Sequence, residues 1–218
     1  MSPEPQPFRA QDPSLSQPER VFLKRGSLGA LLYLPGFLVA LFSPGLGAPG
    51  SVVGLLLSIL GGTLVVAGVA WRSYCSFFIG GRKSVDLVAI GPYSCCRHPL
   101  YFGSFLIGAG SSVMLQSLTG LVLFAVAFLF LYRFVIQEEE SVLEKNHGIE
   151  YLRFKERVPR LIFPTRFPVV EGRYLMIDLK AQANQFKRSL TTLGLVPLLA
   201  LLLYWRGTGL IPVLFDLP

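Results

Sequence analysis

The chain has 218 residues, of which 52% are hydrophobic and only 15% are charged, and its mean hydropathy is +0.54. A soluble domain of this length rarely carries so little charge. The formal net charge is +7, but no nucleic-acid-binding motif accompanies the basic residues, so we expect no nucleic-acid partner. The composition indicates an integral membrane protein, whose spans would be apolar helices of about 20 residues.

Five apolar stretches are long enough, or nearly long enough, to cross a bilayer as helices. In chain order they are residues 28–42, 51–71, 100–116, 118–136 and 190–205. The first and the last are the weakest, because they are short and contain Pro35 and Pro197. No alternating strand pattern competes with them, and a helix satisfies its own backbone hydrogen bonds in lipid. The sequence therefore predicts an all-α bundle of about five transmembrane helices.

Basic residues indicate the orientation of these spans. They precede the first span, occupy the connector between the second and third spans, and crowd the stretch before the last one, whereas residues 43–50 carry no charge. Cytoplasmic loops are enriched in Lys and Arg, so we place the N-terminus and the basic loops in the cytoplasm and the C-terminus outside. The membrane would be a bacterial-type inner membrane or the endoplasmic reticulum.

The chain then divides into four parts. We expect a polar tail over 1–27, a transmembrane hairpin over 28–72, a core with two spans over 73–164, and a basic cytoplasmic segment with the final span over 165–218. The tail lacks the apolar region of a cleavable signal peptide. The connector and the basic segment lie on one side of the membrane, where they can meet over the end of the bundle.

The first polar motif, over residues 91–103, reads GPYSCCRHPLYFG. Its opening Gly-Pro pair predicts a turn, and Pro99 suits the first turn of the third span. Arg97, His98 and Tyr101 would then cluster at a helix N-terminus, where free N–H groups and the helix dipole favour an anion. An ordinary belt of interfacial Arg and Tyr anchors explains the same residues equally well.

The second motif is the acidic run Glu138, Glu139 and Glu140 at the end of the fourth span. Acids at a helix C-terminus oppose the helix dipole, so a cation should compensate them. This cation would be either a basic side chain of the following segment or the ammonium group of a ligand. Successive helical residues lie 100° apart, so at most two of the three acids can line one pocket. Gly148 predicts a helix end, and residues 151–158 suit a short interfacial helix.

The two motifs resemble the signatures of the isoprenylcysteine carboxyl methyltransferase family, which is related to the membrane phospholipid methyltransferases. The matching elements are GPY and RHPxYxG in the first motif, and EExxL, GxEY and VPR over 139–160. The resemblance covers roughly 80–164. It implies methyl transfer from S-adenosylmethionine, at a site facing the cytoplasm, to a lipophilic or lipid-linked acceptor such as an isoprenylcysteine carboxylate.

The same resemblance implies roles for particular residues and no metal. The residues expected along the cofactor are Tyr93, His98, Pro99, Tyr101, Gly103, Glu139 and Glu140, and those expected to be catalytic are Arg97, Tyr101 and Arg133. Methyl transfer from a sulfonium is an in-line displacement, which needs alignment of the reactants more than covalent catalysis. The sequence offers no Ser-His-Asp set, and this chemistry requires none.

Two other classes of protein remain open from the sequence. One is a membrane reductase of the sterol reductase type that uses NADPH, although paired carboxylates would repel the extra phosphate of that cofactor. The other is a non-catalytic membrane scaffold or a small transporter. The acceptor is also open, since isoprenylcysteine, phosphatidylethanolamine and small hydrophobic thiols or amines all suit a membrane methyltransferase.

Overall fold

The computed structural model describes residues 25–47, 50–79, 87–160, 179–215 and 217. Within these ranges the chain forms helices and connecting turns, with no strand. The elements are α2 (Arg25–Phe42), α3 (Val52–Ile79), the 3-10 turn η1 (Gly91–Ser94), α4 (Pro99–Met114), α5 (Leu118–Arg157), α6 (Leu179–Leu193) and α7 (Leu195–Gly207). The prediction of an all-α architecture is confirmed.

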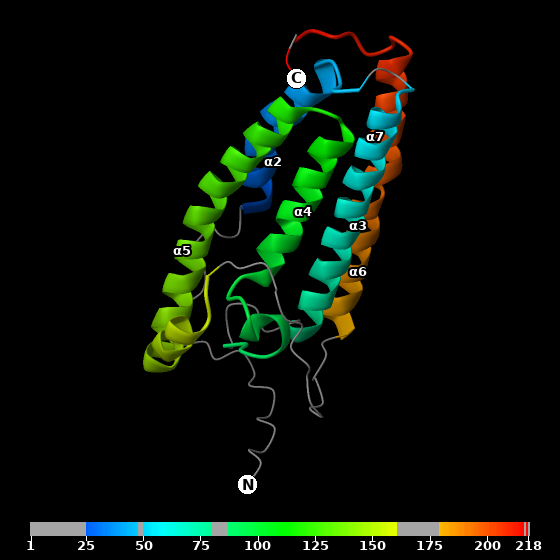
Figure 1. Cartoon of the computed structure of the whole chain (residues 1–218). Helices are drawn as coiled ribbons and strands as arrows, with labels where there is room; N and C mark the ends of the chain where they lie inside the picture. Colours follow the sequence, from blue (N-terminus) through cyan, green and yellow to red (C-terminus); the bar gives the residue numbers. More distant parts are fainter. Residues whose placement is uncertain (1–24, 48–49, 80–86, 161–178, 216, 218) are drawn as a thin grey trace.

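Helix α4 lies in the middle of the bundle, with α5 and α2 on one side and α3, α6 and α7 on the other (Figure 1). It packs most extensively on α3. Small residues allow this close approach, because a Cβ atom on Gly61 would lie only 2.4 Å from the backbone nitrogen of Met114. On its other side, Gly108 receives the ring of Phe124 from α5. Close packing of helices through glycine is typical of membrane bundles.

Three helical segments are long and apolar enough to cross a membrane: Val52–Ile79, Leu118–Arg157 and Gln182–Gly207. The other two helices of the bundle are shorter, since α4 has 16 residues, or about 24 Å at 1.5 Å per residue, and the apolar part of α2 is Tyr33–Phe42. Large apolar side chains stay exposed along α3 and α5, as expected for surfaces that face lipid. The prediction of a membrane bundle of about five helices is confirmed.

The last span differs in extent from its predicted range of 190–205. Helix α6 carries polar residues of the expected basic cytoplasmic segment, and α7 continues it almost directly, because Gly194 between them keeps helical backbone angles (φ −60°, ψ −16°). The polar face of α6 pairs with polar groups near the end of α3. Gln182 donates a 2.7 Å hydrogen bond to the carbonyl of Ser76, and the hydroxyls of Ser73 and Ser189 are 2.9 Å apart.

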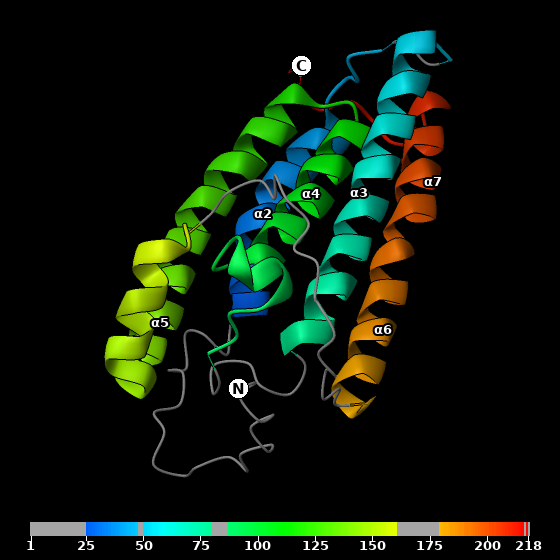
Figure 2. The same cartoon turned by 60° about the horizontal axis from the view of Figure 1, so that its bottom comes forward.

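Helix α5 continues far beyond its apolar part, as the sequence predicts, and is interrupted at Gly148. There the backbone takes φ 50° and ψ −123°, a conformation that only glycine adopts without strain. The chain reverses at this residue, and its last helical turns lie beside the preceding part of α5 (Figure 2). An ion pair of 3.3 Å between Lys155 and Glu144 joins the two parts. The expected helix end at Gly148 is confirmed.

Candidate functional site

The first motif is held at the end of the bundle where α3 stops and α4 begins. Gly91 takes a left-handed conformation (φ 57°), and a Cβ atom there would lie 2.3 Å from the ring of Phe78. The indole nitrogen of Trp71 donates a 2.8 Å hydrogen bond to the carbonyl of Pro99, which opens α4. His98 precedes this proline with non-helical angles (φ −128°, ψ 56°), since the residue before proline avoids the helical region. These contacts fix the start of α4 against α3.

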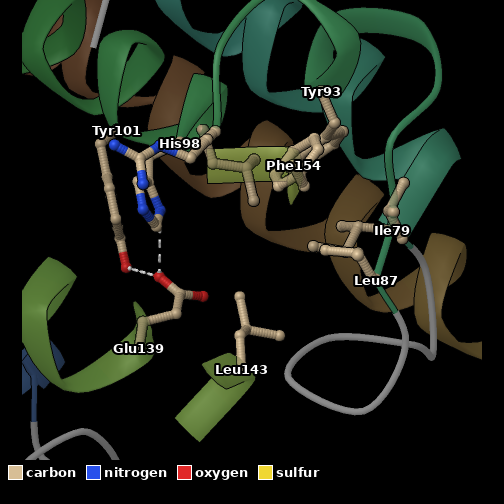
Figure 3. A pocket seen from close by; sticks show the side chains of 11 residues that line it. Ile79, Leu87, Tyr93, His98, Tyr101, Glu139, Leu143 and Phe154 are labelled. Carbon is tan, nitrogen blue, oxygen red and sulfur yellow. Dashed lines mark hydrogen bonds and ion pairs between the residues drawn. The ribbon is translucent and has the colours of Figure 1, made fainter. Parts of the chain in front are cut away.

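The two motifs meet at Glu139. The hydroxyl of Tyr101 donates a 2.6 Å hydrogen bond to Oε2 of Glu139, and His98 Nδ1 lies 3.6 Å from the same oxygen. Figure 3 shows the His98 and Tyr101 side chains next to each other, both directed at this carboxylate. Their rings stack with centroids 5.7 Å apart. All three residues are buried, so the contact joins α4 to α5 in a protected environment.

Glu140, the neighbouring acid, is surrounded by cations. Its Oε1 lies 3.2 Å from His98 Nε2 and 3.0 Å from Arg97 Nη1, and Arg160 contacts both of its oxygens through Nε (3.2 Å) and Nη2 (2.5 Å). A bidentate Arg–carboxylate contact is among the stronger hydrogen-bonded pairs. The expected compensation of the acidic run by basic side chains is therefore present for Glu140.

The pKa values of this cluster follow from its charges. Burial alone would raise the pKa of Glu140, but hydrogen bonds from His98 and Arg160 and the charge of Arg97 outweigh it and lower the pKa to about 2. Burial alone would lower the pKa of His98, but its hydrogen bonds to Glu139 and Glu140 outweigh it and raise the pKa. The cluster thus favours a charged His98 beside a charged Glu140.

A pocket opens beside this cluster. Its lining is Ile79, Leu87, Val88, Tyr93, Arg97, His98, Leu100, Tyr101, Glu139, Leu143 and Phe154. Figure 3 shows apolar side chains such as Leu87 and Leu143 near the polar group of His98, Tyr101 and Glu139. The volume of the pocket is about 40 Å³, whereas a single water needs roughly 10–15 Å³. It can therefore receive a small charged group of a larger ligand.

Several polar atoms around the pocket are buried without a hydrogen bond. Arg97 Nη1 forms the ion pair with Glu140, yet neither Nη1 nor Nε of Arg97 is aligned to donate a hydrogen bond. The hydroxyl of Tyr93 is also buried without a partner, and burial raises its pKa well above the ordinary value. Buried donors without acceptors are costly, so an anionic or polar ligand group would stabilise this arrangement. Glu139 supplies a carboxylate in the same pocket for a cationic group.

The structure brings most of the predicted site residues together, but not all of them. Tyr93, Arg97, His98, Tyr101 and Glu139 line one pocket, and Pro99 begins the helix that carries Tyr101. Glu140 lies behind the pocket as the partner of three cations.

Two predicted residues point elsewhere. Gly103 faces α3, where a Cβ atom would lie 2.6 Å from Arg72 Cγ. Arg133 is exposed on α5 and is not part of the pocket lining. The roles expected for Gly103 and Arg133 from the sequence remain predictions.

The sequence reasoning missed the part that the reversal at Gly148 contributes. Arg160 reaches back 20 residues to Glu140, and Phe154 joins the pocket lining. Tyr151 is fully buried nearby, and burial raises its pKa to about 12. The signal was present in the GxEY and VPR elements around these residues, but a pattern of residues does not give the direction in which the chain turns at Gly148.

Comparison with known proteins points to membrane methyltransferases. The phospholipid methyltransferase family matches residues 50–150, which include α3, α4 and most of α5. The matched part of the chain is therefore related to a class of membrane methyltransferases, and it contains both motifs of the pocket as far as Glu150.

Individual relatives point to one group of proteins within this class. The protein-S-isoprenylcysteine O-methyltransferase of Rattus norvegicus is 36% identical over 125 residues, which are 56% of this chain and 42% of that protein. The human protein of the same name is 34% identical over 126 residues, 53% of this chain and 43% of the relative. The resemblance to the isoprenylcysteine carboxyl methyltransferase family is thus confirmed.

A third relative carries a different name. The nickel-cobalt-cadmium resistance protein NccN of Alcaligenes xylosoxydans xylosoxydans is 39% identical over 105 residues, 48% of this chain and 47% of that protein. The chain spans about half the length of the curated relatives it matches. No solved structure matches it. In the part of the chain that the structure describes, no three His, Cys, Asp or Glu side chains gather as a metal site would require.

Proposed function

We propose that this chain transfers a methyl group from S-adenosylmethionine to a lipophilic or lipid-linked acceptor. The observation that carries the proposal is the pairing of opposite charges in one pocket. Glu139 offers a carboxylate there, and Arg97 offers buried N–H groups that lack a hydrogen-bond acceptor. The amino-acid part of S-adenosylmethionine carries one ammonium and one carboxylate group, which would meet these two side chains.

The other residues of the site would orient this donor. Tyr101 and His98 fix the Glu139 carboxylate, and Glu140 holds Arg97 in place from behind. When bound, S-adenosylmethionine supplies a methyl group on a sulfonium centre. The protein then has to align an acceptor with that centre and keep water away from it. The apolar lining suits this task.

The acceptor would be a lipid-soluble molecule, and an isoprenylcysteine-type carboxylate is the first choice. The named isoprenylcysteine methyltransferases support it through their similarity to this chain. A carboxylate acceptor is already charged at neutral pH, so its oxygen can take the methyl group without a general base. This agrees with a site in which the imidazole of His98 already contacts the carboxylates of Glu139 and Glu140.

We place the pocket on the cytoplasmic side, and the distribution of Lys and Arg along the chain supports this orientation. Single cysteines introduced at Ser51 and Glu156, in a background without native cysteines, test it. A membrane-impermeant maleimide added outside should label Ser51→Cys and leave Glu156→Cys unlabelled. Labelling of Glu156→Cys alone would reverse the orientation.

Transfer of radiolabelled methyl groups tests the activity itself. The purified chain, incubated with labelled S-adenosylmethionine and a farnesylcysteine derivative in detergent, should produce a labelled methyl ester that mild base hydrolyses. Membrane lipid extract offered in parallel tests the other acceptors. A melting temperature raised by NADPH and not by S-adenosylhomocysteine would instead favour a reductase.

A further inference from the structure

A second cavity lies at the opposite end of the bundle from the candidate active site. It has a volume of about 810 Å³ and is lined by the loop after α2, the first turns of α3, Gln116 and the end of α7. Figure 1 shows the loop after α2, the start of α3 and the end of α7 together at the end of the bundle that carries the C-terminus. The region that matches known methyltransferases, residues 50–150, includes neither the loop before Gly50 nor α7. The cavity is therefore built largely from parts of this chain that lie outside the match to the phospholipid methyltransferase family.

The cavity contains one guanidinium group, that of Arg206 in the last turn of α7. Its Nη1 donates 3.2 Å hydrogen bonds to the carbonyls of Ala40 and Ser43 at the end of α2. Its Nη2 lies next to Gly45, because a Cβ atom on Gly45 would be 2.7 Å from that nitrogen. No carboxylate contacts Arg206 within the described residues, and Asp216, an acid close to it in sequence, lies outside them. One nitrogen of the guanidinium thus binds α2, and among the residues that the structure describes its other nitrogens have no hydrogen-bonded partner, so they can contact a ligand.

The neighbouring polar groups are held in fixed positions. Gln116 has a left-handed backbone (φ 60°), which is uncommon for a residue other than glycine. Its side-chain amide donates a 3.1 Å hydrogen bond to the carbonyl of Gly54, and its carbonyl oxygen lies by Gly45 next to Arg206. Strained backbone tends to occur at binding sites. Arg206 and Gln116, which are both partly buried, together form a polar and positively charged floor of the cavity.

The rim of the same cavity is apolar. Leu55, Tyr204 and Val213 line it and are exposed. Tyr204 is followed by Trp205, and such aromatic pairs mark the level of the lipid headgroups in membrane proteins. A cavity with a cationic floor and an apolar rim at this level suits an amphipathic anion.

We propose that this cavity binds the phosphate headgroup of an anionic membrane phospholipid, with Arg206 as the main contact and the acyl chains along the apolar rim. Arginine binds phosphate through several N–H groups at once. An anionic headgroup fits better than a zwitterionic one, because no described residue of the lining offers a carboxylate to an ammonium group. The site is separate from the proposed methyl transfer, which takes place at the other end of the bundle.

Lipid titration of the purified full chain in detergent tests this site. Three probes are added separately while the melting temperature is followed: phosphatidylglycerol, diacylglycerol with the same acyl chains, and inorganic phosphate. Phosphatidylglycerol should raise the melting temperature at concentrations where the other two have no effect. Arg206→Gln should raise its apparent dissociation constant by about tenfold to a hundredfold. Arg153→Gln, which removes an exposed arginine at the other end of the bundle, should leave it unchanged.

A second variant separates lipid binding from folding, because Arg206 also binds α2. Ser58→Leu would fill part of the cavity without removing the bonds of Arg206 to Ala40 and Ser43. It loses the long 3.4 Å hydrogen bond from Gln116 to the Ser58 hydroxyl but keeps the bond of Gln116 to Gly54. It should therefore keep most of the melting temperature of the lipid-free protein and lose the rise with phosphatidylglycerol. An equal rise in parent and Ser58→Leu, or an equal rise with diacylglycerol, would overturn the proposal. An equal rise with inorganic phosphate would show a site for a free anion and overturn the assignment to lipid.

Discussion

The hydroxyl of Tyr101 donates a 2.6 Å hydrogen bond to the carboxylate of Glu139, 38 residues further along the chain. Tyr101 belongs to the first turn of α4, and Glu139 belongs to the part of α5 that continues beyond its apolar residues. This bond links the two motifs of the sequence in one buried contact. It also orients the carboxylate that lines the pocket, so the proposed donor site depends on it.

Removal of this hydroxyl should weaken the donor site without unfolding the protein. In Tyr101→Phe the ring remains packed against His98 and Tyr132, while Glu139 loses a hydrogen bond worth about 1.5 kcal/mol or more. Affinity for S-adenosylhomocysteine, measured by calorimetry, should fall about tenfold. Tyr204→Phe, at an exposed tyrosine of the opposite end, is the matched control. Unchanged affinity in Tyr101→Phe would place the donor elsewhere.

Glu140 should contribute mainly to stability. Its side chain is 4% exposed and contacts Arg97, His98 and Arg160. Glu140→Gln would leave buried cations without their counter-ion, a change that typically costs roughly 3–5 kcal/mol. Thermal unfolding should show a large fall in melting temperature.

The control for this variant is Glu144→Gln on the same helix. Glu144 is 45% exposed and pairs with Lys155, which is 36% exposed, and such surface pairs contribute about 0–1 kcal/mol. Equal melting temperatures for the two variants would mean that the cluster around Glu140 does not stabilise the fold.

The pH dependence of stability should reflect the same cluster. The pKa of Glu140 falls from 4.5 to about 2 on folding, so its contribution is present above pH 4.5 and is lost as the pH falls from 4.5 towards 2. The pKa of His98 is raised above 6.5, so its contribution is present below pH 6.5 and is lost as the pH rises through the folded-state value.

Melting temperatures across this pH range check both effects. The difference in melting temperature between parent and Glu140→Gln should shrink as the pH falls below 4.5. His98→Gln should flatten the decline on the alkaline side. A constant difference between parent and Glu140→Gln at all pH values would contradict the assigned pKa of Glu140.

Gly148 should be required for the return of the chain to the site. Its angles (φ 50°, ψ −123°) are unfavourable for any residue with a Cβ atom, at about 1–3 kcal/mol. Gly148→Ala should therefore lower the melting temperature and weaken the contact of Arg160 with Glu140. Gly62→Ala is the control, because a Cβ atom there would meet nothing closer than 3.8 Å and alanine favours helix. Equal effects of the two changes would exclude a special role for the reversal.

The sequence predicts the fold class and the centre of the site because both depend on local patterns. Apolar runs of membrane length predict the helices. Pro99 predicts the start of α4, and this start places His98 and Tyr101 close together. The acidic run also predicts nearby cations, and Glu140 contacts Arg97, His98 and Arg160.

Other features depend on helix rotation and chain direction, which local patterns specify poorly. Gly103 follows Tyr101 by two residues, or about 200° around the helix, so it faces α3 while Tyr101 faces α5. Arg133 precedes Glu139 by six residues, or about 240° on the same helix, and is exposed. The contact of Arg160 with Glu140 requires the reversal at Gly148, and the cavity around Arg206 requires the distant ends of α2 and α7 to meet.

Titration of S-adenosylhomocysteine into single glutamine variants of the acidic run tests the central claim most directly. Glutamine keeps the shape of glutamate and removes its charge. Glu139→Gln should raise the dissociation constant by about tenfold to a hundredfold, the effect of losing a charge-assisted hydrogen bond of roughly 1.5–3 kcal/mol. Glu138→Gln should bind like the parent, since Glu138 does not line the pocket. Lost affinity in Glu138→Gln with full affinity in Glu139→Gln, or full affinity in both, would contradict the proposed donor site.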